Sequence, residues 1–209
     1  MIHLRIERSA PDAYDLAPAV AALKNGGVVA FPTETFYGLA VDPRSAAAVA
    51  KVFELKQRAP DQPLPLIASD IDQVAGHAGT LTPLAARLAS RGWPGPLTLI
   101  IPASRHLCDA VHLSTGTIAV RVPADAVARA LAARVGHAIT STSANISGEP
   151  PSATPDRVVA SLGSGIDVLI DAGPTPAGLP STIVDATGDV PVLVRAGAIP
   201  WDRVLEFSR

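Results

Sequence analysis

Short apolar runs alternate with amphipathic stretches along the chain, and this alternation predicts an α/β fold. Mostly apolar runs that are bounded by Gly, Pro, Asn or other polar residues are typical of buried strands. The pattern predicts strands at residues 28–31, 64–68, 97–101, 117–122, 137–141, 166–170, 182–184 and 192–195.

Helices are predicted where apolar residues recur at three- and four-residue spacing behind a capping residue. The first covers residues 11–24, with Leu16, Val20 and Leu23 on one face, and ends at Asn25-Gly26-Gly27. The remaining helices are expected after the caps Ser45, Ser69 (in a Ser-x-x-Asp capping box), Thr82 and Thr154, over residues 126–135, and from about Pro200.

Strands and helices alternate without an internal repeat or a linker, so we expect one domain over residues 1–209 with a largely buried, mixed β-sheet. A chain of 209 residues with 48% hydrophobic content can bury a sizeable core. Ligands bind at strand ends in open α/β sheets. The loops after Phe31, Val122 and Ser141 are therefore the first places to look for a site.

Composition narrows the classes of function. The net charge is −2, so there is no general basic field for unspecific binding to nucleic acid or anionic membranes. Two Trp, two Tyr and four Phe are too few for a broad base-stacking surface. Cys108 is the sole cysteine, the start lacks a signal-peptide apolar run, and charged or Pro residues interrupt every long apolar stretch. We expect a cytoplasmic protein with no membrane partner.

The common nucleotide and hydrolase signatures are absent: G-x-x-x-x-G-K-[ST], G-x-G-x-x-G, H-E-x-x-H and G-x-S-x-G. Residues 105–112 invite a zinc interpretation, because they include His106, Cys108, Asp109 and His112. His106 and Cys108 do not share a helical face, however, and a second Cys-x-x-Cys half is missing. A solvated His pair beside a core cysteine is favoured, and no metal site is assigned.

Two local clusters could bind phosphates or bicarbonate. Lys56 and Arg58 stand at a predicted helix end, where cations ordinarily complement the helix dipole, but the stiff loop 59–63 could hold both toward a cleft. Residues 141–148 present several hydroxyls and one amide just after a strand. Such clusters are usually plain turns, yet they also supply phosphate donors without a glycine loop, so both interpretations stay open.

Arg121 and Arg195 are embedded in apolar strands, where a charge is costly unless a partner or anionic ligand meets it. For these two we favour function. Hydroxyl-bearing or acidic residues in residues 33–37 and 181–182 could instead be turn, cap or strand-start residues without a task.

Six separated motifs resemble, in their order, the YrdC/TsaC-type threonylcarbamoyl-AMP synthase family, and they span about residues 16–199. They are Pro-Thr-Glu-Thr-Phe-Tyr-Gly-Leu (32–39), Lys-x-Arg (56–58) with Pro63-Leu64, Thr-Ile-Ala-Val-Arg-Val-Pro (117–123), Ser-Thr-Ser-Ala-Asn-x-Ser-Gly (141–148), Ser-Thr-Ile-Val-Asp (181–185) and Val-Arg-x-Gly (194–197).

The resemblance implies a twisted mixed sheet with a deep concave face, and condensation of L-threonine, bicarbonate and ATP to L-threonylcarbamoyladenylate with release of diphosphate. This product serves threonylcarbamoyl modification of tRNA adenosine 37. Mg²⁺ is expected to accompany ATP, and the product is expected to pass to a tRNA threonylcarbamoyl transferase with at most transient tRNA contact. The protein would act by positioning and charge stabilisation.

The resemblance also implies a role for each matching residue. The catalytic set would be Lys56, Arg58, Ser143 and Asn145. L-Threonine would contact Thr35, Arg121, Ser141 and Ser181, with Thr33 and Tyr37 in the same motif. ATP would contact Arg58, Gln62, Thr117, Ser143, Pro151 and Arg195.

Two departures from the family pattern stand out. Residues 64–68 lack a histidine that touches threonine in some members, and because the chain ends near residue 209 we expect it to lack the C-terminal domain and lid of the longer members. Two alternatives remain: a carbamoyltransferase-type domain and a structured-RNA-binding module. The net charge of −2 argues against RNA as the main ligand.

Overall fold

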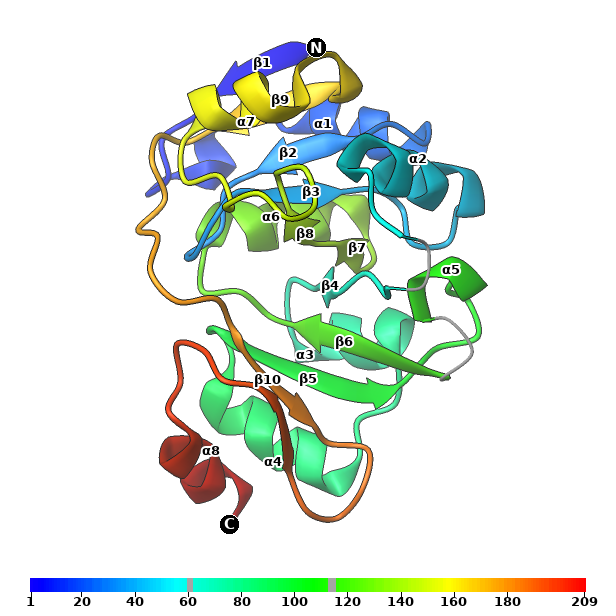
Figure 1. The fold of residues 1–209 in the computed structure, drawn as a ribbon, viewed down its shortest axis with the longest axis vertical. Helices are drawn as coiled ribbons and strands as arrows, with labels where there is room; N and C mark the ends of the chain where they lie inside the picture. The colour runs from blue at the N-terminus through cyan, green and yellow to red at the C-terminus, as the bar shows by residue number, and fades with distance from the viewer. Residues whose placement is uncertain (60–61, 113–115) are drawn as a thin grey trace.

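Two β-sheets, one above the other in Figure 1, form the framework of the protein. The computed structural model describes residues 1–59, 62–112 and 116–209, so Pro60 and Asp61 of the predicted stiff loop lie outside the described residues. In the described part, the upper sheet has the strand order β1 (Ile2–Arg5), β9 (Val168–Asp171), β2 (Val29–Phe31), β3 (Gly38–Ala40) and β8 (Thr142–Ser143).

The upper sheet contains both parallel and antiparallel strand pairs, and so does the lower sheet. Its described strands run in the order β11 (Val192–Arg195), β10 (Thr182–Asp185), β5 (Leu97–Pro102), β6 (Thr117–Arg121), β4 (Leu66–Ile67) and β7 (Ile139–Thr140). Strands β10 and β5 are parallel, as are β4 and β6, whereas β5 and β6 are antiparallel. The α/β class with mixed pairing is confirmed, but the strands divide between two sheets.

Ser141 is the residue at which the chain passes from one sheet to the other. The predicted strand at 137–141 is shorter than expected, because β7 ends at Thr140 and β8 begins at Thr142 in the upper sheet. The amide of Ser141 donates to the carbonyl of Pro65, 2.8 Å away. A polar loop was expected immediately after this strand, and β8 was not.

Helices cover both faces of the upper sheet, and others flank the lower one (Figure 1). The described helices are η1 (Pro11–Ala13), α1 (Ala17–Lys24), α2 (Ala46–Lys56), α3 (Ile71–Gln73), the π-helix η2 (Val74–Ala78), α4 (Pro83–Gly92), α5 (Asp109–His112), α6 (Ala126–Val135), α7 (Pro155–Leu162), η4 (Gly163–Gly165) and α8 (Trp201–Ser208). None of these has the length and apolar character that a membrane crossing requires.

Strand β2 shows how the core is organised. Val29 and Phe31 pack in one cluster with residues of α1 and α6, whereas Ala30 packs in a second cluster with residues of α2. All three side chains are fully buried. A strand covered on both faces is apolar at every position, which explains the continuous apolar run.

Helix starts agree with the sequence where the cap is local. The Ser45 hydroxyl accepts from the Ala48 amide, and Thr82 and Thr154 cap α4 and α7 in the same way. The Ser69 cap was wrong, because the carboxylate of Asp70 accepts from Gln73 and caps α3. The predicted helix over residues 11–24 is also shorter, since α1 begins at Ala17 after the separate turn η1.

Candidate active site

Lys56 is the last residue of α2 and is almost completely buried, with 2% of its surface exposed. Its ammonium group donates to the carbonyl oxygens of Ser143 and Asn145, the second at 2.7 Å. Burial, and secondarily the positive charge of Arg58, lowers the pKa of Lys56 to about 8. One cation therefore holds two carbonyl groups of the loop that follows β8.

The end of α2 also places Arg58 against the segment that begins with β8. Gln57 adopts a left-handed conformation (φ 50°), which stops the helix, and the Arg58 amide donates back to Phe53. The Arg58 guanidinium donates to the Thr142 hydroxyl at 3.2 Å and to the Pro63 carbonyl at 3.1 Å. Lys56 and Arg58 thus both contact the segment that begins with β8. The predicted role of loop 59–63 in holding the two cations toward a cleft stays a prediction, because Pro60 and Asp61 lie outside the described residues.

Asn145 fixes the shape of this segment from within. Its side-chain amide, as assigned, donates to the carbonyls of Ile146 and Glu149, both at 2.8 Å. The Asn145 Oδ1 atom is buried and has no hydrogen-bond partner among the described residues. The amide of Ser147 donates to the carbonyl of Lys56 at 2.9 Å. These contacts hold the loop in one shape and leave the Asn145 Oδ1 atom as an acceptor without a partner in the described part of the chain, so the segment is more than a plain solvent-exposed turn.

Arg121 ends β6 and forms an ion pair with Glu34. Only 8% of Arg121 is exposed, and burial lowers the pKa of its guanidinium although Glu34 opposes that shift. The sequence motif contained Glu34, but no role was predicted for it. Its position between two threonines in a polar loop after β2 was the available signal; its partner lies 87 residues away in the sequence.

Arg195 joins Ser181 on the neighbouring strands. Its guanidinium donates to the Ser181 carbonyl at 2.8 Å and to the Ser181 hydroxyl at 3.1 Å. The Ser181 and Thr98 hydroxyls are 2.8 Å apart. Partial burial, and secondarily the charge of Arg121, lowers the pKa of Arg195, so the two guanidinium groups are near enough to repel each other.

Thr33 and Tyr37 make contacts that support the loop at residues 33–37. The buried Thr33 hydroxyl donates to the Phe36 carbonyl at 2.7 Å, accepts from the Thr35 and Phe36 amides, and lies 3.0 Å from the Thr35 hydroxyl. Tyr37 is fully buried and donates to the Gly173 carbonyl at 2.7 Å. Burial raises the pKa of Tyr37. Thr35 is half-buried.

Four predicted residues remain: Ser141, Thr117, Gln62 and Pro151. Ser141 is half-buried, and a methyl group added at Gly38 would lie 3.3 Å from its hydroxyl. Thr117 begins β6, roughly 13 Å along the strand from Arg121 at its end. Gln62 is exposed, and Pro151 is half-buried.

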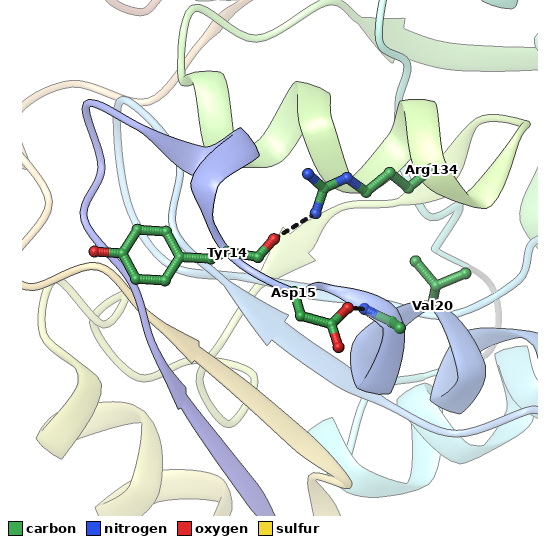
Figure 2. Close-up of a pocket in the computed structure, with 5 residues that line it drawn as sticks. Tyr14, Asp15, Val20 and Arg134 are labelled. Atoms are coloured by element: carbon green, nitrogen blue, oxygen red, sulfur yellow. Dashed lines mark hydrogen bonds between the residues drawn. The ribbon is translucent and has the colours of Figure 1, made fainter.

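Two surface pockets occur away from the candidate residues. A shallow one of about 340 Å³ lies by Tyr14, Asp15 and Arg134, whose guanidinium donates to the Tyr14 carbonyl at 2.8 Å (Figure 2). Another of about 190 Å³ is lined by His106 and His137, among others. In the described ranges, no three or more His, Cys, Asp and Glu side chains are grouped to hold a metal.

A known protein family matches the part of the chain that contains these candidate residues. The model of the Sua5, YciO and YrdC proteins, described as "Telomere recombination", matches residues 21–197. The chain belongs to the Sua5/YciO/YrdC family. The match contains every motif that the sequence analysis singled out, from residue 32 to residue 197.

Members of this Sua5/YciO/YrdC family with curated names are similar over most of the chain. Threonylcarbamoyl-AMP synthase of Bacillus subtilis is 38% identical over 190 residues, which are 90% of this chain and 55% of the relative. The protein of the same name from Alkalilimnicola ehrlichii is 42% identical over 176 residues, 83% of this chain and 92% of the relative.

A solved Sua5 structure shows the same fold. The crystal structure of Pyrococcus abyssi Sua5 complexed with L-threonine has a TM-score of 0.87 and 35% identity, and the similarity covers 99% of this chain and 60% of that one. The chain spans about 55% of the length of the longer synthases from B. subtilis and P. abyssi.

Proposed function

We propose that the protein is a nucleotidyltransferase that condenses L-threonine, bicarbonate and ATP to L-threonylcarbamoyladenylate and releases diphosphate. The observation that carries the proposal is the direct contact of Lys56 with the carbonyls of Ser143 and Asn145. The Lys-x-Arg and Ser-x-Asn motifs, 87 residues apart, are thereby one structural unit. The names of the relatives and the L-threonine in the P. abyssi Sua5 complex support the same reaction.

The cations at the end of α2 suit the phosphate side of the reaction. The amine of L-threonine and bicarbonate give a carbamate and water, and a carbamate oxygen then attacks the α-phosphorus of ATP as diphosphate leaves. Negative charge accumulates on the phosphoryl oxygens, and Lys56 and Arg58 would stabilise it. Ser143 would add a hydroxyl donor, and Asn145 would keep the loop in shape for bicarbonate and the phosphates.

Arg121 suits the amino-acid side, because a guanidinium binds a carboxylate through two parallel hydrogen bonds. Thr35, Ser141 and Ser181 would contact the rest of L-threonine, and Thr33 and Tyr37 would hold the loop that carries Thr35. The ATP contacts of the proposal are Arg58, Gln62, Thr117, Ser143, Pro151 and Arg195.

Mg²⁺ is proposed to enter with ATP rather than to occupy a protein cage. The described residues offer no cluster of carboxylates or histidines for it, and Mg²⁺ in such sites is usually bound through substrate phosphates and water. Its chemistry would be neutralisation of phosphate charge. The proposal also includes a cytoplasmic location and transfer of the product to a tRNA-modifying transferase, with residues 1–209 acting as one domain.

The deciding experiment measures diphosphate release by the purified protein. Release is expected only when ATP, L-threonine and bicarbonate are all present with Mg²⁺, and the adenylate product is identified by mass spectrometry. Release without L-threonine, or no release from folded protein, would contradict the proposal. Lys24→Met, a change on an exposed helix end, serves as the control for Lys56 variants.

A further inference from the structure

Glu34 and Arg121 form a mostly buried ion pair on the amino-acid side of the site. Their side chains are 16% and 9% exposed, so little water screens the interaction. The loop that carries Glu34 is held by the Thr33 hydroxyl and by Arg8, which donates to the Thr33 carbonyl at 3.2 Å. The Glu34 carboxylate is therefore a fixed charge beside the guanidinium.

Asp125, the other acid near Arg121, is already engaged. Its Oδ2 pairs with Arg8 at 2.5 Å, and its Oδ1 accepts from the amides of Val127 and Ala128 at 2.9 and 3.1 Å. Its charge is thus balanced by a cation and a helix N-terminus. Glu34 is left as the anion that directly balances Arg121.

The ion pair uses only part of the guanidinium. Glu34 receives a hydrogen bond from Nη1 of Arg121. In the described part of the chain, no partner is found for Nη2 or Nε of Arg121, and neither atom is among the fully buried polar atoms that lack a partner. These two donors are therefore not completely enclosed, although the side chain is only 9% exposed, and they are the Arg121 atoms that a carboxylate could bind while Glu34 stays in place.

A carboxylate bound there lies close to the negative charge of Glu34. The Glu34 Oε2 atom is buried and has no hydrogen-bond partner among the described residues, so the hydrogen bond from Arg121 to Oε1 is the contact that disperses the carboxylate charge there. A plain carboxylate is repelled by Glu34 as well as attracted by Arg121. The ammonium group of an α-amino acid offsets the repulsion, because it brings a positive charge to the same place.

We propose that Glu34 is a specificity residue that makes the subsite prefer a zwitterionic α-amino acid over a carboxylate lacking the amine. The inference rests on the proposed function, in which Arg121 receives the carboxylate of L-threonine. It adds that the acid beside Arg121 takes part in recognising the substrate, and does more than neutralise a buried charge.

The test compares two ligands by calorimetric titration: L-threonine and (R)-3-hydroxybutyrate, which is threonine without its ammonium group. Wild-type protein is expected to bind L-threonine at least about tenfold more tightly. Glu34→Gln should reduce this ratio toward one, partly through tighter binding of (R)-3-hydroxybutyrate. Glu34→Asp, which keeps the charge, should retain the preference. Glu54→Gln, the same change at an exposed position of α2, should match the wild type.

The outcomes separate the two proposals. If wild-type protein binds both ligands equally, or if Glu34→Gln weakens both by the same factor, Glu34 has no role in selectivity and this inference is overturned. If Glu34→Gln does not fold, Glu34→Ala removes the same charge and decides it: a ratio near one supports the inference, and an unchanged ratio overturns it. If wild-type protein neither binds L-threonine nor releases diphosphate, the proposed function itself is wrong.

Discussion

Lys56 donates a hydrogen bond to the carbonyl oxygen of Asn145 at 2.7 Å, which ties the end of α2 to a loop 89 residues further along the chain. The same ammonium group donates to Ser143. The cation thus shapes the loop, and under the proposed function it would also supply positive charge to the phosphate side.

Lys56→Met is expected to lower diphosphate release at least about 100-fold, because a preorganised cation at developing negative charge is lost. Methionine keeps most of the side-chain volume, and burial of a charge is no longer required, so the fold should be retained. Steady-state turnover and circular dichroism check the two parts. Turnover close to that of Lys24→Met would show that Lys56 serves only the loop.

The pKa of Lys56 predicts how stability and activity change with pH. Because burial lowers this pKa from 10.5 to about 8, the unfolded state binds more protons than the folded state between these values. Stability from this group therefore rises with pH across that range, by up to roughly 3 kcal/mol, while the positive charge proposed to act in catalysis is lost. Denaturant unfolding from pH 7 to 10 should show the rise in wild type and not in Lys56→Met.

Tyr37→Phe tests whether the tyrosine hydroxyl supports the fold or binds substrate. The hydroxyl is buried and bonded to the Gly173 carbonyl, so its removal should lower the free energy of unfolding by about 1–2 kcal/mol. The Kd for L-threonine should stay unchanged in titration calorimetry. A large rise in Kd at unchanged stability would instead assign Tyr37 to the substrate.

Asn145→Asp places an oxygen opposite the carbonyls of Ile146 and Glu149, in place of the amide that donates to both. The variant should lose about 2–4 kcal/mol of stability at pH 8. The buried carboxyl should have a raised pKa in the folded state, so part of the loss is regained as pH falls. Chemical denaturation at pH 8 and pH 5 measures this difference; equal losses at both values would argue against it.

The sequence predicted features whose cause is local. The caps Ser45, Thr82 and Thr154 depend on the next turn of helix, and β2 depends on an unbroken apolar run. Strand β1 was missed because its residues are largely exposed and its partner β9 lies more than 160 residues away. The pattern of residues within a strand does not indicate which distant strand it pairs with.

The candidate site likewise contains residues that the sequence indicated and contacts that it did not. The sequence pointed to Arg121 because a cation inside an apolar strand is unusual, and it pointed to Lys56 and Arg58 through the stiff loop that follows them and the family motifs. No role was predicted for Glu34, because the ion pair that suggests one is formed with Arg121 on a distant strand. The contacts of Lys56 with backbone carbonyls could not be predicted either, because every residue type has a backbone carbonyl.

The junction at Ser141 has a kinetic consequence. Arg58 contacts Thr142 in the upper sheet, whereas Arg121 belongs to the lower sheet, and a single residue separates β8 from β7. The distance between the cations proposed to bind the nucleotide and the cation proposed to bind the amino acid is therefore set by how one sheet packs against the other. Volume changes in the core shared by both sheets, at Leu39 or Leu66 for example, are remote from the chemistry but should misalign the two reactants. Under the proposed function, catalytic alignment would thus depend on interior packing.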